Sequence, residues 1–256
     1  MSESSSSKNL ALFIEENTIT YLTQSISENE YFYSEPVRFE IKQGLSTIEF
    51  DDLLIEIKKQ LPLLLYYNSI KVVYNTFDFQ IIPNAYLNNN DRSNIDFFED
   101  QHFRINRLNH IDAKFTFRYY KNLNSVFNTL PNFKDAKYFH VGESLINKNL
   151  VHQELSQVFV RLINQNLELC IFKNGNFHLY NMFNQNSDED VIYYVINTIQ
   201  QLEINPATVE VIIDHGFTDN HKIFEYLPKF VKSVKVDAKT AGKDFKFLLN
   251  NLFECE

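Results

Sequence analysis

The order of the apolar segments constrains this chain most, because the same order occurs twice along its 256 residues. In each half, three short segments with strand character precede a segment with helical spacing and one further apolar strand. Short turns make the first three strands antiparallel, whereas the intervening helix allows the last strand to run parallel. The pattern therefore predicts an α/β protein of two similar units, each with a mixed sheet flanked by helices.

The strands expected in the first half cover residues 10–14, 18–23, 31–39 and 69–74. A helix is expected before the last of them, because apolar residues recur there at helical spacing, namely Ile48, Leu53, Leu54, Ile57, Leu61 and Leu64. Ser46 or Thr47 is the expected N-cap, with Glu49 completing a capping box from Ser46. Pro62 is expected to end or kink this helix.

The strands expected in the second half cover residues 158–163, 166–172, 177–183 and 208–213. Asn174-Gly175 is expected to form a tight hairpin turn, because both residue types accept the positive φ angles that such turns need. Ser187 is expected to cap a helix with three acidic residues in its first turn. Its apolar stripe is expected to consist of Val191, Val195, Ile199 and Leu202.

Additional segments lie between the halves and at the end of the chain. They are a short helix after Ser93, a strand at 113–120, a helix at 123–130, a strand at 137–141, a helix at 221–227, a strand at 231–236 and a helix at 245–253. The expected organisation is a disordered N-terminus at 1–8, a first subdomain with an insertion at 9–150, and a second subdomain at 151–256.

Charge and composition exclude several classes of protein. A net charge of −9 argues against nucleic acid and against anionic lipid, both of which attract basic proteins. The two cysteines, Cys170 and Cys255, do not indicate a disulfide framework. The Ser-rich N-terminus lacks the apolar core of a secretory signal, and no apolar run is long enough to span a bilayer. A soluble, cytoplasmic protein is expected.

One stretch of the chain, Phe79 to Leu87, resembles the signature Thr-Leu-Val-Pro-x-x-Leu-Phe of the DUF3822 family, uncharacterised proteins from Bacteroidetes. Gln80 stands in place of the usual threonine, and Tyr86-Leu87 in place of Leu-Phe. Tyr138 to Leu145 occupies the place of a His-x-x-Ser-Leu-like segment of that family. The resemblance implies two tandem ribonuclease-H-like units, the architecture of actin, Hsp70 and sugar kinases, with no established activity.

The same resemblance implies where ATP would be held. Its phosphates would meet the turn between the first two strands of each unit, where Asp-x-Gly supplies backbone N–H groups and a magnesium-binding carboxylate. The first turn here, Ile14 to Asn17, has no glycine and has adjacent carboxylates that repel phosphate. The second, Ile163 to Asn166, has neither glycine nor carboxylate. Both turns therefore lack the chemistry that binds phosphate.

The remaining candidate for a nucleotide site is the loop after residues 208–213. In related ATPases a Gly-Gly pair would contact adenosine there, and this chain keeps Gly216, followed by Thr218. The same loop is the best metal candidate, since Asp214, His215, Asp219 and His221 are close in sequence. Their spacing fits no standard metal site, and we expect neither a metal nor a cofactor.

Other chemistries find less support. A ribonuclease-H-like nuclease needs several carboxylates that converge on two metals, but the fourth strand of the first half ends at the neutral Asn75. There is no Gly-x-Ser-x-Gly elbow, and Cys170 lies in an apolar strand. Aromatic neighbours such as Tyr193-Tyr194 place one ring on each face, which suits a protein interface.

The sequence thus favours a non-catalytic actin-like scaffold or interaction module that binds an unidentified protein or forms a homodimer. The alternatives are a divergent ATP-binding protein that uses the loop around Gly216 and, less well supported, a ribonuclease-H-like nuclease.

Overall fold

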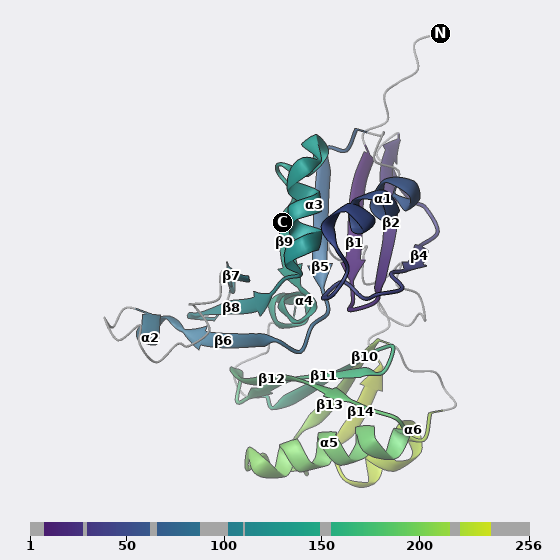
Figure 1. The fold of residues 1–256 in the computed structure, drawn as a ribbon. Helices are drawn as coiled ribbons and strands as arrows, with labels where there is room; N and C mark the ends of the chain where they lie inside the picture. Colours follow the sequence, from purple (N-terminus) through teal and green to yellow (C-terminus); the bar gives the residue numbers. More distant parts are fainter. Residues whose placement is uncertain are drawn as a thin grey trace. The chain divides into compact units, whose positions relative to one another are not determined.

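The computed structural model describes residues 8–27, 30–61, 66–87, 102–109, 111–148, 155–215 and 221–236. These residues form two compact units, the first ending at Glu143 and the second beginning at Ser144 (Figure 1). The expected boundary at 150–151 and the expected helices after Ser93 and at 245–253 lie outside the described residues. No helix within these ranges is long and apolar enough to cross a membrane.

The first unit is built on one six-stranded mixed sheet. Its strands are β1 (Lys8–Ile14), β2 (Thr18–Ser27), β3 (Glu30–Tyr33), β4 (Val37–Glu40), β5 (Ser69–Tyr74) and β9 (Lys137–His140). The order is β3-β2-β1-β5-β9, with β4 also paired to β2. β1, β5 and β9 are parallel, whereas β2 runs antiparallel to β1. The single strand expected at 31–39 is wrong, because Ser34 to Pro36 separate β3 from β4, and Pro36 lacks a backbone donor.

Helices α1 (Phe50–Gln60) and α3 (Lys121–Thr129) cover one face of this sheet (Figure 1). α1 ends two residues before Pro62, as expected, and the backbone of Leu61 is already extended. The expected capping box is wrong, because the N-cap is Glu49 and no side chain caps this helix. A 3₁₀ turn, Pro131–Phe133, follows α3, and α4 (Val141–Lys148) begins directly after β9.

A separate three-stranded antiparallel sheet is inserted between β5 and α3. It consists of β6 (Phe79–Pro83), β7 (Phe103–Arg107) and β8 (Ala113–Arg118), in the order β6-β8-β7, with a short helix α2 (Asn84–Leu87) after β6. Of these elements, only β8 was expected from the sequence. Phe115 and Phe117 on β8 are completely buried and pack around the imidazole of His140.

The second unit has a five-stranded sheet in the order β12-β11-β10-β13-β14. The strands are β10 (Gln157–Ile163), β11 (Asn166–Lys173), β12 (Asn176–Asn184), β13 (Glu210–His215) and β14 (Ser233–Val236). The Asn174-Gly175 turn has φ values of 51° and 74°, which confirms the predicted hairpin. Helix α5 (Asp188–Gln201) buries Val191, Val195 and Ile199 against one face, and α6 (Ile223–Tyr226) with the 3₁₀ turn Leu227–Lys229 precedes β14.

The two sheets share one plan of strand pairing, except that both β3 and β4 pair with β2 where β12 alone pairs with β11. In each sheet the first strand, β1 or β10, starts an antiparallel meander and pairs in parallel with β5 or β13. That strand in turn pairs in parallel with β9 or β14. The unit that starts at β1 differs from the unit that starts at β10 chiefly by the inserted sheet. The predicted order of strands and helices is therefore present in both halves.

Candidate functional site

The carboxyl ends of β1, β5 and β9 meet at one edge of the first sheet, since these three strands are parallel. Ligands of open α/β sheets commonly bind at such an edge. Glu15 follows β1, Asn75 and Thr76 follow β5, and His140 is the last residue of β9. These residues are the candidate site of the first unit.

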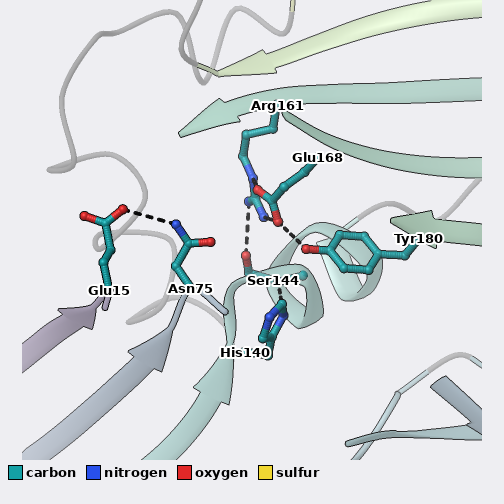
Figure 2. Close-up of polar contacts among 8 residues, drawn as sticks. Glu15, Asn75, His140, Ser144, Arg161, Glu168 and Tyr180 are labelled. Carbon is teal, nitrogen blue, oxygen red and sulfur yellow. Dashed lines mark hydrogen bonds and ion pairs between the residues drawn. The ribbon is translucent and has the colours of Figure 1, made fainter. Parts of the chain in front are cut away.

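Glu15 is held by neighbours of its own unit. Its carboxylate accepts a hydrogen bond from the Thr18 hydroxyl at 2.8 Å. It accepts a second from Nδ2 of Asn75 at 3.2 Å (Figure 2). Arg38 lies 3.9 Å away from the same carboxylate. Asn75 is buried, and its Oδ1 has no hydrogen-bond partner within the described residues. The carboxylate therefore organises the turn after β1.

The backbone of this turn is also engaged. The N–H of Glu15 donates to the carbonyl of Thr18, while the N–H groups of Ile41 and Leu45 donate to the carbonyls of Asn17 and Glu16, both at 2.7 Å. Gly44 makes this close approach possible: its φ is +74°, and a Cβ there would lie 2.7 Å from Oδ1 of Asn17. The segment that contains Gly44 therefore packs directly on the turn.

His140 is fixed as a neutral imidazole. Its Nδ1 accepts a hydrogen bond from the N–H of Gly142 at 3.0 Å, so this nitrogen carries no proton. Its Nε2 lies 2.8 Å from the carbonyl oxygen of Thr76, and must carry the proton, because a carbonyl can only accept. The ring is completely buried and stacks on Phe115 with centroids 4.7 Å apart. Such a histidine supports the structure and is unavailable as an acid or base.

Glu143, in the first turn of α4, is the most perturbed carboxyl group of this region. Burial raises its pKa to about 7, although hydrogen bonds from the backbone N–H of His140 and from the Asn106 side chain favour the ionised form. The first bond is 2.6 Å long, and Asn106 Nδ2 lies 2.9 and 3.0 Å from the two carboxylate oxygens. Both donors belong to the first unit, and their hydrogen bonds fix the position of Glu143 in the first turn of α4.

The equivalent turn of the second unit joins β10 to β11. Asn164 has a φ of 55°, and the strands pair up to Ile163 and Asn166, so the turn is a tight two-residue hairpin. The carbonyl of Gln165 accepts from the N–H of Gln185 at 2.9 Å. The turn offers no charge of either sign.

The second unit contains a buried polar cluster that the sequence analysis missed. Arg161 on β10 donates to Glu168 on β11 at 2.5 and 3.1 Å, and both side chains are almost completely buried. The Tyr180 hydroxyl donates to the same carboxylate, and Arg161 donates to the Ser144 hydroxyl at 3.2 Å (Figure 2). Since Arg161 and Glu168 are equally distant from the predicted turn, their pairing in register was readable from the sequence.

The sequence-predicted nucleotide residues, Gly216 and Thr218, lie outside the described residues, as does Asp219. His221 contacts Asp188 at the start of α5, with Nδ1 2.7 Å from Oδ1. Across the described ranges, no group of three or more His, Cys, Asp or Glu residues is placed to hold a metal ion. The described residues of this candidate loop therefore form no metal-binding group.

Comparison with known proteins places this geometry in context. The family described as "Protein of unknown function (DUF3822)" matches residues 2–234. A protein of Bacteroides thetaiotaomicron, with an actin-like ATPase fold and unknown function, is 16% identical and covers 98% of this chain and 97% of its own, with a TM-score of 0.74. A chain of the PilM-PilN type IV pilus biogenesis complex is 9% identical over 97% of this chain and 98% of its own, with a TM-score of 0.57.

No curated protein matches the sequence. At these identities the structural likeness shows the fold alone. It confirms the predicted α/β architecture of two tandem ribonuclease-H-like units of the actin type.

Proposed function

Because this chain belongs to the DUF3822 family, a family of unknown function, its role has to be argued from its own side chains, and we propose a non-catalytic actin-like scaffold or protein-interaction module. The observation that carries the proposal is the state of the turn after β1. Carboxylates occupy it, and Glu15 is already bonded to Thr18 and Asn75. A phosphate placed there would meet like charge.

The turn after β10 supports the same conclusion for a different reason. Asn164 and Gln165 are neutral, and each carries a Cβ. A phosphate loop uses glycine at such positions, because the missing Cβ lets backbone N–H groups approach the phosphate closely. The first turn therefore lacks the glycine of a phosphate loop, and the second lacks both the glycine and the carboxylate.

The partner in this proposal is a protein, either a second copy of the chain or an unidentified one. The negative net charge disfavours nucleic acid. Tyr193 on α5 is 62% exposed while Tyr194 stacks on Phe183, so one ring of this aromatic pair faces outward. A solved structure of the same fold, from the PilM-PilN complex, comes from a protein assembly, an analogy at the level of fold only. A cytoplasmic location is part of the same proposal, since the two cysteines of the sequence do not indicate a disulfide framework.

The direct test is release of phosphate from ATP by the purified chain with magnesium, compared with buffer and with the Asn75→Ala variant. We expect wild type and variant to match the buffer. ATP hydrolysis that exceeds the buffer rate and is lost in Asn75→Ala would overturn the proposal, since it would place an active centre at the carboxyl edge of the first sheet.

A further inference from the structure

Arg104 points into the first unit from the inserted sheet. On β7 it pairs with Phe117 of β8; Phe117 is completely buried and Arg104 is half-buried. Its guanidinium carbon lies 3.5 Å from the centroid of the Tyr138 ring on β9, and Nη2 donates to Oδ1 of Asn124 on α3 at 2.7 Å. The guanidinium is thus held between a strand and a helix that are distant from it in sequence.

The guanidinium of Arg104 has no carboxylate partner within the described residues, unlike those of three other arginines. Arg38 lies near Glu15, Arg118 contacts Asp78, and Arg161 is paired with Glu168. For Arg104 the contacts are neutral: the Asn124 amide and the rings of Tyr138 and Tyr119.

Two hydrogen-bond donors in this cluster are buried without an acceptor in the described part of the chain. They are Nε of Arg104 and the hydroxyl of Tyr74, a side chain that is 0% exposed. The Tyr74 ring lies 5.8 Å from the ring of Phe117, the cross-strand partner of Arg104. Burial raises the pKa of Tyr74, and the positive charge of Arg104 opposes this rise. A buried donor without an acceptor is costly, and an unpaired cation more so. An acceptor that carries negative charge would relieve both.

We propose that Arg104, Tyr74 and Asn124 form a binding site for an oxyanion, a carboxylate or phosphate group. The planar guanidinium can give two parallel N–H bonds to such a group, the tyrosine hydroxyl a third, and the Asn124 amide nitrogen a fourth. The rings of Tyr138 and Tyr119 wall the site and strengthen these bonds by excluding water. Burial raises the pKa of Tyr120, whose ring lies 6.0 Å from that of Tyr74, and the carboxylates of Glu16, Asp78 and Glu15 raise it further. These three carboxylates are the negative charges that would repel an anion bound at the site.

The test uses the full chain without nucleotide or magnesium, so its outcome is independent of the proposed function. Sodium phosphate and sodium acetate are titrated at constant ionic strength, with calorimetry and Tm as readouts. Arg104→Gln removes the guanidinium. Arg107→Gln is the matched control, because Arg107 lies on the same strand, is exposed, and faces the opposite side of the sheet.

We expect saturable binding to wild type and Arg107→Gln, and at least about tenfold weaker binding to Arg104→Gln. Preference for phosphate or acetate distinguishes a free phosphate from the acidic side chain of a protein. The inference is wrong if neither anion binds saturably, or if Arg104→Gln binds as tightly as Arg107→Gln.

Tyr74→Phe provides a second test that keeps the shape of the core. Without anion, its Tm is expected to equal or exceed that of wild type, because the variant removes a buried hydroxyl that has no acceptor. With a saturating anion, the rise in Tm is expected to be smaller than in wild type. An equal rise in both proteins would contradict the assignment of Tyr74 to the site.

Discussion

Glu143 and Glu168 are both buried carboxyl groups, but they are stabilised by different means. Glu168 faces the guanidinium of Arg161 and accepts hydrogen bonds from it and from Tyr180. Glu143 accepts hydrogen bonds from neutral donors only, namely the side-chain amide of Asn106 and the backbone N–H of His140. An ionised carboxylate in a buried site needs a countercharge, so the two residues are expected to respond differently to substitution.

Glu143 is expected to make the protein less stable as the pH rises. Its pKa increases from 4.5 to about 7 on folding, so the folded chain binds a proton more tightly than the unfolded chain. The raised pKa contributes roughly 3 kcal/mol to the free energy of unfolding. This stabilisation is fully present below pH 4.5 and is lost as the pH rises to about 7. Glu143→Gln removes the ionisable group. Urea unfolding at pH 5 and pH 7.5 should show that the free energy of unfolding changes less with pH in the variant than in wild type. An equal change in both proteins would mean that Glu143 does not cause the pH dependence.

Glu168→Gln is expected to destabilise the second unit by about 3–5 kcal/mol, because it leaves the buried guanidinium of Arg161 without a countercharge. The matched control is Glu225→Gln, which breaks an exposed ion pair with Lys229 and should have little effect. Urea unfolding monitored by circular dichroism measures both. A Glu168→Gln variant as stable as the control would mean that the Arg161–Glu168 pair is not formed in solution.

At the level of elements, the two long helices next to the sheets begin differently. α5 has a complete capping box, in which Ser187 accepts from the N–H of Asp190 while the Asp190 carboxylate accepts from the N–H of Ser187. α1 begins at Glu49 without a side-chain cap. A cap satisfies backbone donors that the first helical turn leaves open, so the start of α5 depends on one side chain and the start of α1 does not.

Ser187→Ala is therefore expected to lower the free energy of unfolding by about 1 kcal/mol. Ser46→Ala, at the N-cap expected from sequence for α1, should leave it almost unchanged. Hydrogen exchange of the first-turn amides of α5 locates the effect. A larger loss of stability for Ser46→Ala than for Ser187→Ala would contradict the observed caps.

Elements with strong local signals were predictable from sequence, and elements defined by distant contacts were not. The cap at Ser187 and the Asn174-Gly175 turn depend on neighbouring residues. β7, with the sequence Phe-Arg-Ile-Asn-Arg, is short and polar, and is a strand because it pairs with β8. The continuation of β9 into α4 was also missed, because the apolar residues around Val141 suit either structure.

The same distinction applies to the polar sites. The Arg161–Glu168 pair spans a two-residue turn, so its register follows from the hairpin. The environment of Glu143 depends on Asn106, which reaches it from the inserted sheet 37 residues earlier in the chain. Likewise, Arg104 meets Tyr138 and Asn124 only because the inserted sheet packs against β9 and α3. No local sequence pattern predicts such contacts.

At the scale of the whole molecule, two sheets with a similar order of strands differ in the elements and side chains around them. The unit that starts at β1 carries the inserted sheet, which supplies Arg104 and Asn106 and encloses His140. The unit that starts at β10 carries the buried Arg161–Glu168 pair. In both units, the turn between the first two strands is closed by the chain's own contacts. An actin-like fold has therefore been kept while its phosphate-binding turns lack the usual chemistry.

Calorimetric titration of the purified chain with ATP and magnesium is the decisive test of whether this fold has lost its nucleotide site. We expect no magnesium-dependent binding up to millimolar ATP. Binding that persists without magnesium and is lost in Arg104→Gln would belong to the proposed oxyanion site. A saturable, magnesium-dependent isotherm that Gly216→Val abolishes would refute the loss of the site, and would show that the fold holds its nucleotide through the loop after β13.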